Sequence, residues 1–348
     1  MRVWSGPKRP ASVVGNILRD AGFIRSFPCA GALGEASALP VLTLRLRIAL
    51  AFVSIYTIWG STYLAIRFAI ETVPPFLMAA IRFLIAGGVL YAWIRLRGAP
   101  RPTRANWKAA TVVGGLLLLG GNGGVTRAEL VIPSSLASVL ITTVPIWMAL
   151  LELLRKDRIV PTRHVVLGLV LGFGGVILLV GPGDLGGSGG LNALWAGVLI
   201  LAALSWAIGS VYSRNALLPK TPLLGSGMEM LAGGALLLVA SLISQELAGF
   251  QPGNVSFLSL VSFIYLIVFG SLIGFSSYVW LLTKTTTARV STYAYVNPVV
   301  AVFLGYFLAG EQLTLRTLLA SSVIVIAVVV ITTFKSRQTV PGDDDSKG

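Results

Sequence analysis

The sequence predicts an all-α integral membrane protein whose ten transmembrane helices form two inverted five-helix repeats. The first observation behind this prediction is composition: 55% of the 348 residues are hydrophobic and 11% are charged, against about 25% charged residues in a soluble domain. The second is a mean hydropathy of +0.85, which requires much of the surface to face lipid rather than water. The third is an internal repeat with an odd number of helices in each half.

Ten apolar runs are long enough to cross a bilayer, which takes about 20 residues in a helix. They cover approximately residues 48–66, 76–94, 109–126, 134–154, 164–180, 191–212, 223–244, 257–281, 289–309 and 315–334. Each run exceeds the length of about 9–11 residues typical of a membrane barrel strand, and none alternates polar with apolar residues. Helices are therefore predicted for every run.

The ends and the middle of the chain differ from these runs in composition. Residues 1–46 contain scattered Arg and Pro and no long apolar stretch, which predicts a basic, disordered cytoplasmic extension. The first repeat is expected over 47–180 and the second over 191–334, joined by a Gly-rich linker at 181–190. A polar cytoplasmic tail is expected over 335–348.

The distribution of Lys and Arg predicts the orientation. With the N-terminus inside, 23 of the 27 cations fall in cytoplasmic segments, and only Arg67, Arg127 and Arg316 fall in loops on the other side. Cytoplasmic loops of membrane proteins are enriched in Lys and Arg, so both termini are expected in the cytoplasm. The formal charge of +14 then reflects this bias and not nucleic-acid binding.

Equivalent residues in the two halves reveal the repeat. Arg82 follows Pro75 by seven residues, and Glu229 follows Pro222 by the same interval. Further equivalent positions are Trp59 with Trp206 and Pro145 with Pro298. Because each half has five helices, the second half enters the membrane from the opposite side, which predicts a site near the midplane between the halves.

Short motifs in both halves resemble a known family. They are Trp59-Gly60-Ser61-Thr62-Tyr63, Arg82-Phe83, Gly121-Asn122-Gly123, Tyr293-Ala294-Tyr295-Val296-Asn297-Pro298 and Gly310-Glu311. Together they resemble the EamA family of the drug/metabolite transporter superfamily, most closely its YedA-type branch of bacterial inner-membrane exporters. The resemblance covers about residues 46–335 and implies two EamA repeats that export small metabolites or drugs, including amino acids. The Gly-Glu signature occurs once, since the first half has Lys156-Asp157-Arg158 at the equivalent place.

Two charged residues lie within predicted spans, where a charge costs about 3 kcal/mol on insertion scales. Arg82 and Glu229 are therefore expected to line the transport pathway or to pair across it. The alternative is that Arg82 snorkels and Glu229 lies near the cytoplasmic interface. Asn122, among four glycines, either faces a cavity or serves as a packing amide.

Aromatic residues are candidates for the lining of the same pathway, although Trp and Tyr also mark membrane interfaces. The complete set of candidate substrate-binding or pathway residues is Trp59, Ser61, Tyr63, Arg82, Asn122, Trp206, Glu229, Tyr278, Tyr293 and Asn297. Pro145 and Pro298 are expected to shape helices and not to bind the solute. The small residues Gly168, Gly172 and Gly175 are interpreted as a scaffold or dimer contact.

These observations predict a secondary transporter that exports a small organic solute across the bacterial plasma membrane by alternating access. No metal or redox cofactor is expected, because one cysteine and one histidine, Cys29 and His164, permit no disulfide and no histidine cluster. No enzymatic activity is expected either. Proton counter-transport through Glu229, solute exchange and a homodimer stay open. The alternatives are a passive channel and an intramembrane aspartyl protease built on Gly181-Pro182-Gly183-Asp184, but the protease needs a second Asp within a span, and none occurs.

Overall fold

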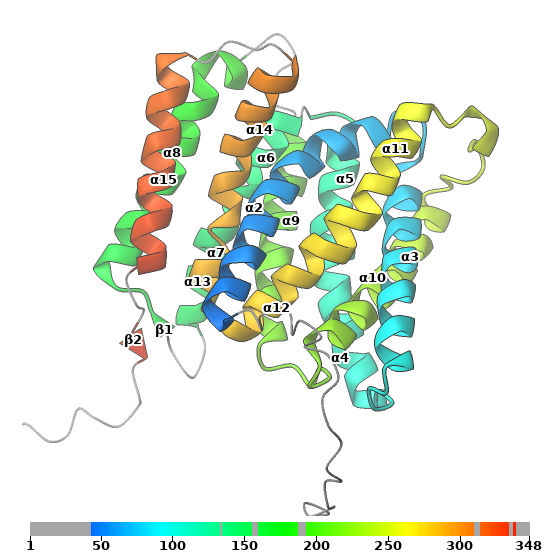
Figure 1. Ribbon diagram of the computed structural model, residues 1–348. Coiled ribbons are helices and arrows are strands. Elements are labelled where there is room, and N and C mark those ends of the chain that lie inside the picture. The colour runs from blue at the N-terminus through cyan, green and yellow to red at the C-terminus, as the bar shows by residue number, and fades with distance from the viewer. Residues whose placement is uncertain are drawn as a thin grey trace, which may run out of the picture. The chain divides into compact units, whose positions relative to one another are not determined.

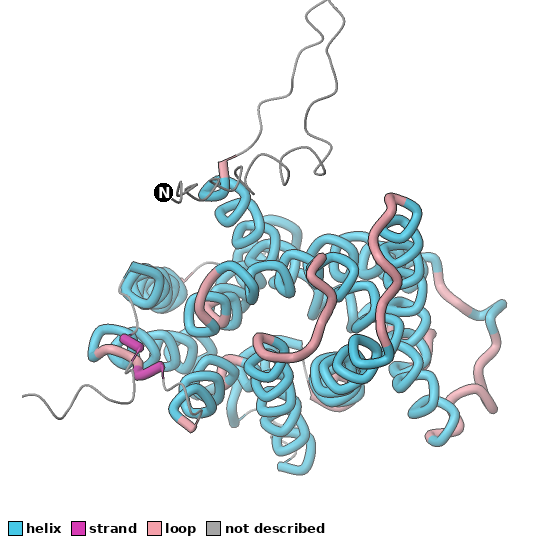
Figure 2. The backbone as a smooth tube through the Cα atoms, turned by 90° about the horizontal axis from the view of Figure 1, so that it is seen from below, coloured by secondary structure: helices cyan, strands magenta, loops and turns pink. Residues whose placement is uncertain are grey.

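A computed structural model describes residues 43–132, 134–154, 159–186, 193–309, 314–333 and 337–338. The unit that begins at Leu44 is a bundle of helices (Figure 1). Seen from below, most of these helices appear nearly end-on, so they run in roughly one direction (Figure 2). The predicted N-terminal extension, except for its last four residues, and most of the predicted C-terminal tail lie outside the described residues.

The helices of the bundle follow the ten predicted runs. The first half contains α2 (Leu44–Ala69), α3 (Pro75–Leu96), α4 (Arg104–Gly114), a π-helix (Gly115–Gly123), α5 (Gly124–Ala128), α6 (Ser134–Ile141), α7 (Val144–Leu153) and α8 (Arg163–Gly186). The second half contains α9 (Ala193–Ser213), α10 (Pro222–Ile243), a short 3₁₀ turn (Pro252–Asn254), α11 (Phe257–Tyr265), a π-helix (Leu266–Phe275), α12 (Ser276–Lys284), α13 (Thr287–Val290), α14 (Tyr293–Ala309) and α15 (Leu315–Thr333).

The prediction of an all-α membrane fold is confirmed for the part of the chain that the structure describes. Seven of its helices are long and apolar enough to cross a membrane, and the shorter apolar stretches Ala137–Leu153 and Arg163–Leu179 accompany them. These elements are consistent with ten membrane-crossing segments. The only strands among the described residues are β1 (Ile159–Val160) and β2 (Arg337–Gln338), which pair antiparallel.

Local sequence explains where the helices begin. Thr103 caps α4, because its side chain accepts a hydrogen bond from the Asn106 backbone N–H while the Asn106 side chain accepts one from the Thr103 backbone N–H. Pro75 and Pro222 occupy the first positions of α3 and α10, where a missing N–H costs no helical hydrogen bond. The equivalent prolines thus start equivalent helices.

The predicted linker differs from the structure at its first half. Helix α8 continues to Gly186, whereas the sequence predicts its end at residue 180. Glycine lowers the stability of a helix but does not prevent one, so a Gly-rich segment can continue a helix that begins before it. Residues 187–192 lie outside the described residues.

The two halves pack against each other through reciprocal contacts of α3 and α10, which lie side by side in Figure 1. A Cβ added at Gly87 would lie 2.9 Å from the carbonyl oxygen of Gly227, and a Cβ added at Gly234 would lie 3.2 Å from that of Ala80. Gly87 and Gly234 follow Pro75 and Pro222 by the same interval, and so do Ala80 and Gly227. Each contact is therefore the image of the other, as a two-fold relation between inverted repeats requires.

Helices α8 and α15 form a second pair, at the opposite edge of the bundle in Figure 1. The small residues of α8 face neighbours within the chain: Gly168 packs against Ile331, Gly172 against Tyr295 and Gly175 against Ile324. Small residues let helices approach closely in a membrane. This face of α8 is thus an internal scaffold contact.

Candidate functional site

A central pocket lies between the two halves and encloses a void of about 630 Å³, open space at its mouth included. Seven of the ten candidate pathway residues line it: Trp59, Tyr63, Arg82, Asn122, Trp206, Tyr293 and Asn297. The remaining lining residues are Thr62, Ile66, Phe83, Leu118, Gly121, Val125, Ile141, Val144, Ala202, Gly270 and Phe275. Both repeats contribute, so the pocket has the position expected of a small-molecule site between repeats.

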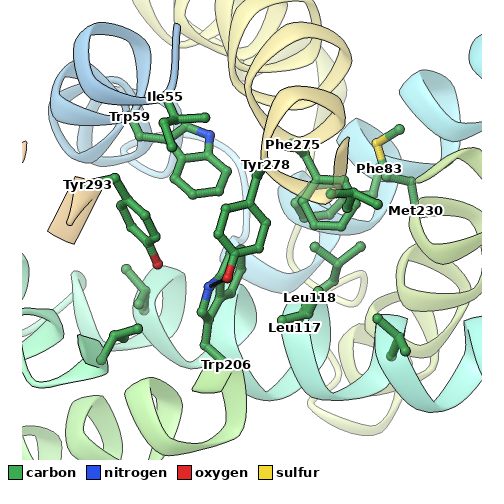
Figure 3. Packing of buried hydrophobic residues seen from close by; sticks show 14 of the residues in the cluster. Ile55, Trp59, Phe83, Leu117, Leu118, Trp206, Met230, Phe275, Tyr278 and Tyr293 are labelled. Atoms are coloured by element: carbon green, nitrogen blue, oxygen red, sulfur yellow. Dashed lines mark hydrogen bonds between the residues drawn. The ribbon is translucent and has the colours of Figure 1, made fainter. Parts of the chain in front are cut away.

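Four aromatic residues, Trp59, Trp206, Tyr278 and Tyr293, form an aromatic cluster at one side of the pocket (Figure 3). Ring centroids lie 4.8 Å apart for Trp59 and Tyr293, 5.1 Å for Trp59 and Tyr278, and 5.6 Å for Trp59 and Trp206. Such tilted and edge-to-face arrangements are the favourable ones for aromatic pairs. Tyr278 is fully buried and does not line the pocket, whereas the other three rings of the cluster do.

Hydrogen bonds fix the orientation of these rings. The Trp206 indole N–H donates to the Tyr278 hydroxyl at 2.8 Å, and the Ser210 hydroxyl lies 2.6 Å from the same oxygen. The Trp59 indole N–H donates to the Gly270 carbonyl at 3.2 Å. Buried indole and phenol groups need such partners, so these bonds hold the rings of Trp59, Trp206 and Tyr278 in fixed orientations.

Each tryptophan of the cluster packs against a π-helix of the opposite repeat. A Cβ at Gly274 would lie 2.5 Å from Trp59 Nε1, and a Cβ at Gly121 would lie 2.8 Å from Trp206 Cε3. Glycine leaves the room that each indole occupies, and π-helical segments are frequent at functional sites. The equivalence of Trp59 and Trp206 in the sequence is thus matched by equivalent packing.

Arg82 extends from α3 into the pocket wall and is 3% exposed. Its Nε donates to the Ser271 hydroxyl at 2.7 Å, while its Nη1 has no hydrogen-bond partner. The guanidinium carbon lies 4.6 Å from the centre of the Phe83 ring, a cation–π contact.

Glu229 lies in α10 and does not line the pocket. It is fully buried, and neither carboxylate oxygen has a hydrogen-bond partner. The predicted pair with Arg82 is therefore wrong for this structure.

The physical reason lies in the crossing of α3 and α10. The reciprocal glycine contacts place Arg82 and Glu229 at different heights along the packed helices, about five residues or about 7 Å of helix rise apart. The two residues also adjoin different elements: the Arg82 side chain donates to Ser271 in the second π-helix, whereas the backbone of Glu229 adjoins Gly114 of α4. Two-fold-related residues away from the axis face their own surroundings and not each other.

Ser61 also lies outside the pocket lining. Its hydroxyl donates to the Ile58 carbonyl at 2.7 Å and lies 2.6 Å from the Tyr265 hydroxyl. Pro145 is the second residue of α7, just after the break that separates α6 from α7, and Pro298 lies inside α14. Their expected roles in shaping these helices stay predictions.

Glu129, directly after α5, is a buried acid that sequence reasoning missed. It is fully buried, and neither carboxylate oxygen has a hydrogen-bond partner. Arg67 donates only to the Glu129 backbone carbonyl, at 2.6 Å. Burial raises the pKa of the Glu129 carboxyl well above its usual range, and the charge of Arg67 opposes this shift. The one signal in the sequence is an acid flanked by apolar residues on both sides.

The family that this chain matches is recognised twice, once in each half of the chain. The model of the EamA-like transporter family matches residues 46–181 and again 193–333. The inner membrane transporter YedA of Escherichia coli (strain K12) is 41% identical over 284 residues, which cover 81% of this chain and 89% of the relative. A WAT1-related chloroplastic protein of Arabidopsis thaliana is 26% identical over 285 residues, covering 80% of this chain and 68% of the relative.

A solved crystal structure is similar in fold, with a TM-score of 0.66 and 21% identity, covering 82% of this chain and 96% of the other. The bundle, the pocket between repeats and the two matches define a membrane transporter. The chain belongs to the EamA-like transporter family, and its relatives indicate a multi-pass inner membrane protein that is a transporter and not an enzyme.

Proposed function

We propose that the chain is a secondary transporter that exports a small organic solute across the plasma membrane by alternating access. The observation that carries this proposal is a pocket lined by residues of both repeats, three rings of the aromatic cluster among them. Because the repeats are inverted, exchanging their conformations exposes the same site to the other side of the membrane.

The contacts of Trp59 and Trp206 support this exchange. Each tryptophan rests on a π-helix of the other repeat, so the two contacts are related by the same two-fold relation as α3 and α10. Glu229 lies outside the pocket, at the position of the second repeat that is equivalent to Arg82 in the first. We expect the inward-facing state to bring Glu229 into the pathway, where it serves in proton counter-transport.

The orientation with both termini in the cytoplasm follows from the distribution of cations. Reporter domains fused after Ala105, Leu217 and Thr286 should report the cytoplasm, and a fusion after Phe250 should report the outside. A periplasmic report after Leu217 contradicts the orientation.

Transport itself is tested with purified protein in proteoliposomes, after a resistance screen of overproducing cells with metabolites and toxins has identified a solute. Alternating access predicts flux that saturates with solute concentration and exchange of labelled for unlabelled solute across the membrane. Large single-channel currents favour a channel, and formation of product favours an enzyme.

The matched variants for this assay are two tryptophan substitutions. Trp59→Ala removes one wall of the aromatic cluster and should abolish saturable exchange. Trp93→Ala, at a position of α3 that is 45% exposed and outside the pocket, should leave exchange unchanged. Equal exchange in both variants contradicts a role for the cluster.

A further inference from the structure

The central pocket carries a positive charge that nothing in it neutralises. Arg82 is the one ionisable cation among the described lining residues, and no Asp or Glu lines the pocket with it. A guanidinium stays protonated in proteins. Burying an unpaired charge is costly, so the pocket is electrostatically incomplete without an anion.

Arg82 also has a free hydrogen-bond donor for that anion. Its Nε donates to Ser271, while its Nη1 is buried without a hydrogen-bond partner, and the residue lines the pocket. A carboxylate accepts charge-assisted hydrogen bonds from guanidinium N–H groups. One positive charge matches one negative charge, which favours a monocarboxylate over a doubly charged phosphate.

The rest of the lining describes the body of the ligand. Trp59, Trp206 and Phe275 present apolar ring surface, and Asn297 adds a buried side-chain oxygen that has no hydrogen-bond partner. Pockets of this kind bind a largely apolar body and orient it with a few polar groups.

We propose that the pocket binds organic monocarboxylates, with the carboxylate against Arg82 and a flat apolar body against Trp59 and Trp206. Calling this ligand the transported solute rests on the proposed function, but the binding site itself does not.

The experiment measures binding by calorimetry to the full chain in lipid nanodiscs. The probes are two acid and amide pairs of nearly equal shape, benzoate with benzamide and indole-3-acetate with indole-3-acetamide, together with phenyl phosphate. We expect each acid to bind at least about tenfold more tightly than its amide, and phenyl phosphate to bind more weakly than benzoate.

Substitutions assign the preference to one side chain. Arg82→Gln should reduce the acid-to-amide affinity ratio to about one, while Arg82→Lys should retain part of the preference. The amide shows whether the pocket is intact, because its binding should survive Arg82→Gln. Arg127→Gln removes a cation outside the pocket lining and should leave the ratio unchanged.

Several outcomes overturn the proposal: equal binding of acid and amide to the unchanged protein, a preference that persists in Arg82→Gln, tighter binding of phenyl phosphate than of benzoate, or no binding of either acid at millimolar concentration. Acid binding without solute flux would contradict the transport function and leave the anion site standing. Flux of a solute without acid binding would do the reverse.

Discussion

Two adjacent glycines of α3 offer a direct test of the crossing that joins the repeats. At Gly87 an added Cβ would lie 2.8 Å from the Leu231 backbone nitrogen and 2.8 Å from Met230 Cβ, whereas at Gly88 no atom lies within 4 Å. The Gly87→Ala contacts fall short of a relaxed separation of about 3.5 Å by about 0.7 Å. Because the obstacle includes the backbone of α10, the helices themselves must separate.

The magnitude follows from comparing the two substitutions. Overpacking of this kind costs about 1–3 kcal/mol, while replacing Gly by Ala inside a helix contributes about 0.4–1 kcal/mol at either position. The helical contribution cancels in the comparison, so Gly87→Ala should be less stable than Gly88→Ala by about 1–3 kcal/mol. Gly234→Ala, whose Cβ would lie 3.0 Å from the Leu84 backbone nitrogen, should be destabilised in the same direction but less.

The assay is unfolding of the purified protein in detergent, followed by tryptophan fluorescence with rising temperature and with rising denaturant. Gly88→Ala is the matched control, because it makes the same chemical change one residue away. Equal stability of Gly87→Ala and Gly88→Ala would refute the close approach of α3 and α10, and with it the geometric basis of the inverted repeat.

Three further predictions concern the aromatic cluster and the buried acid Glu129. Gly274→Ala should displace the indole of Trp59 and lower the unfolding temperature, and Trp59→Phe should partly restore stability in the double variant; additive losses would contradict this contact. Tyr278→Phe should cost about 1–2 kcal/mol, because the Trp206 indole N–H loses its acceptor; unchanged stability and tryptophan emission would show that this bond does not matter. Because the folded-state pKa of Glu129 is raised, the unchanged protein should lose stability as the pH rises above about 4.3, the unfolded-state pKa. Glu129→Gln has no carboxyl to ionise and should therefore gain stability relative to the unchanged protein over this pH range. Parallel pH profiles of the unfolding temperature would contradict the burial of this carboxyl.

Sequence reasoning found the helices and much of the pocket because both depend on patterns along the chain. Long apolar runs identify spans, and the equivalent positions of Trp59 and Trp206 singled out two residues that the structure places in one wall. The pairing of Arg82 with Glu229 failed for a related reason. An equal distance from two prolines gives the level of a residue in its own helix, but not the direction of its side chain around the helix axis.

Features that arise only from tertiary packing were not predictable in the same way. The π-helix at Gly115–Gly123 has an apolar, Gly-rich sequence that an α-helix accommodates as well, and the indole of Trp206, far away in the chain, lies against it. Glu129 follows a predicted span, so its place in the sequence predicts a solvent-exposed acid at a helix end. Its burial comes from neighbouring elements that are distant in the chain.

In the proposed mechanism, the charges at the two equivalent positions are not interchangeable. A carboxyl group can take up a proton and become neutral, whereas a guanidinium stays charged. In this structure Glu229 is buried outside the pocket, whereas Arg82 lines it. Burying the Glu229 side chain therefore costs less free energy than burying the Arg82 side chain, because protonation removes the charge of the carboxylate. In the opposite state the structure encloses Arg82, and the free-energy cost of burying its charge falls only when an anion accompanies the guanidinium. Closing one side then depends on a proton and closing the other on a bound anion, which is the chemical asymmetry that an exporter with inverted repeats needs to couple two gradients.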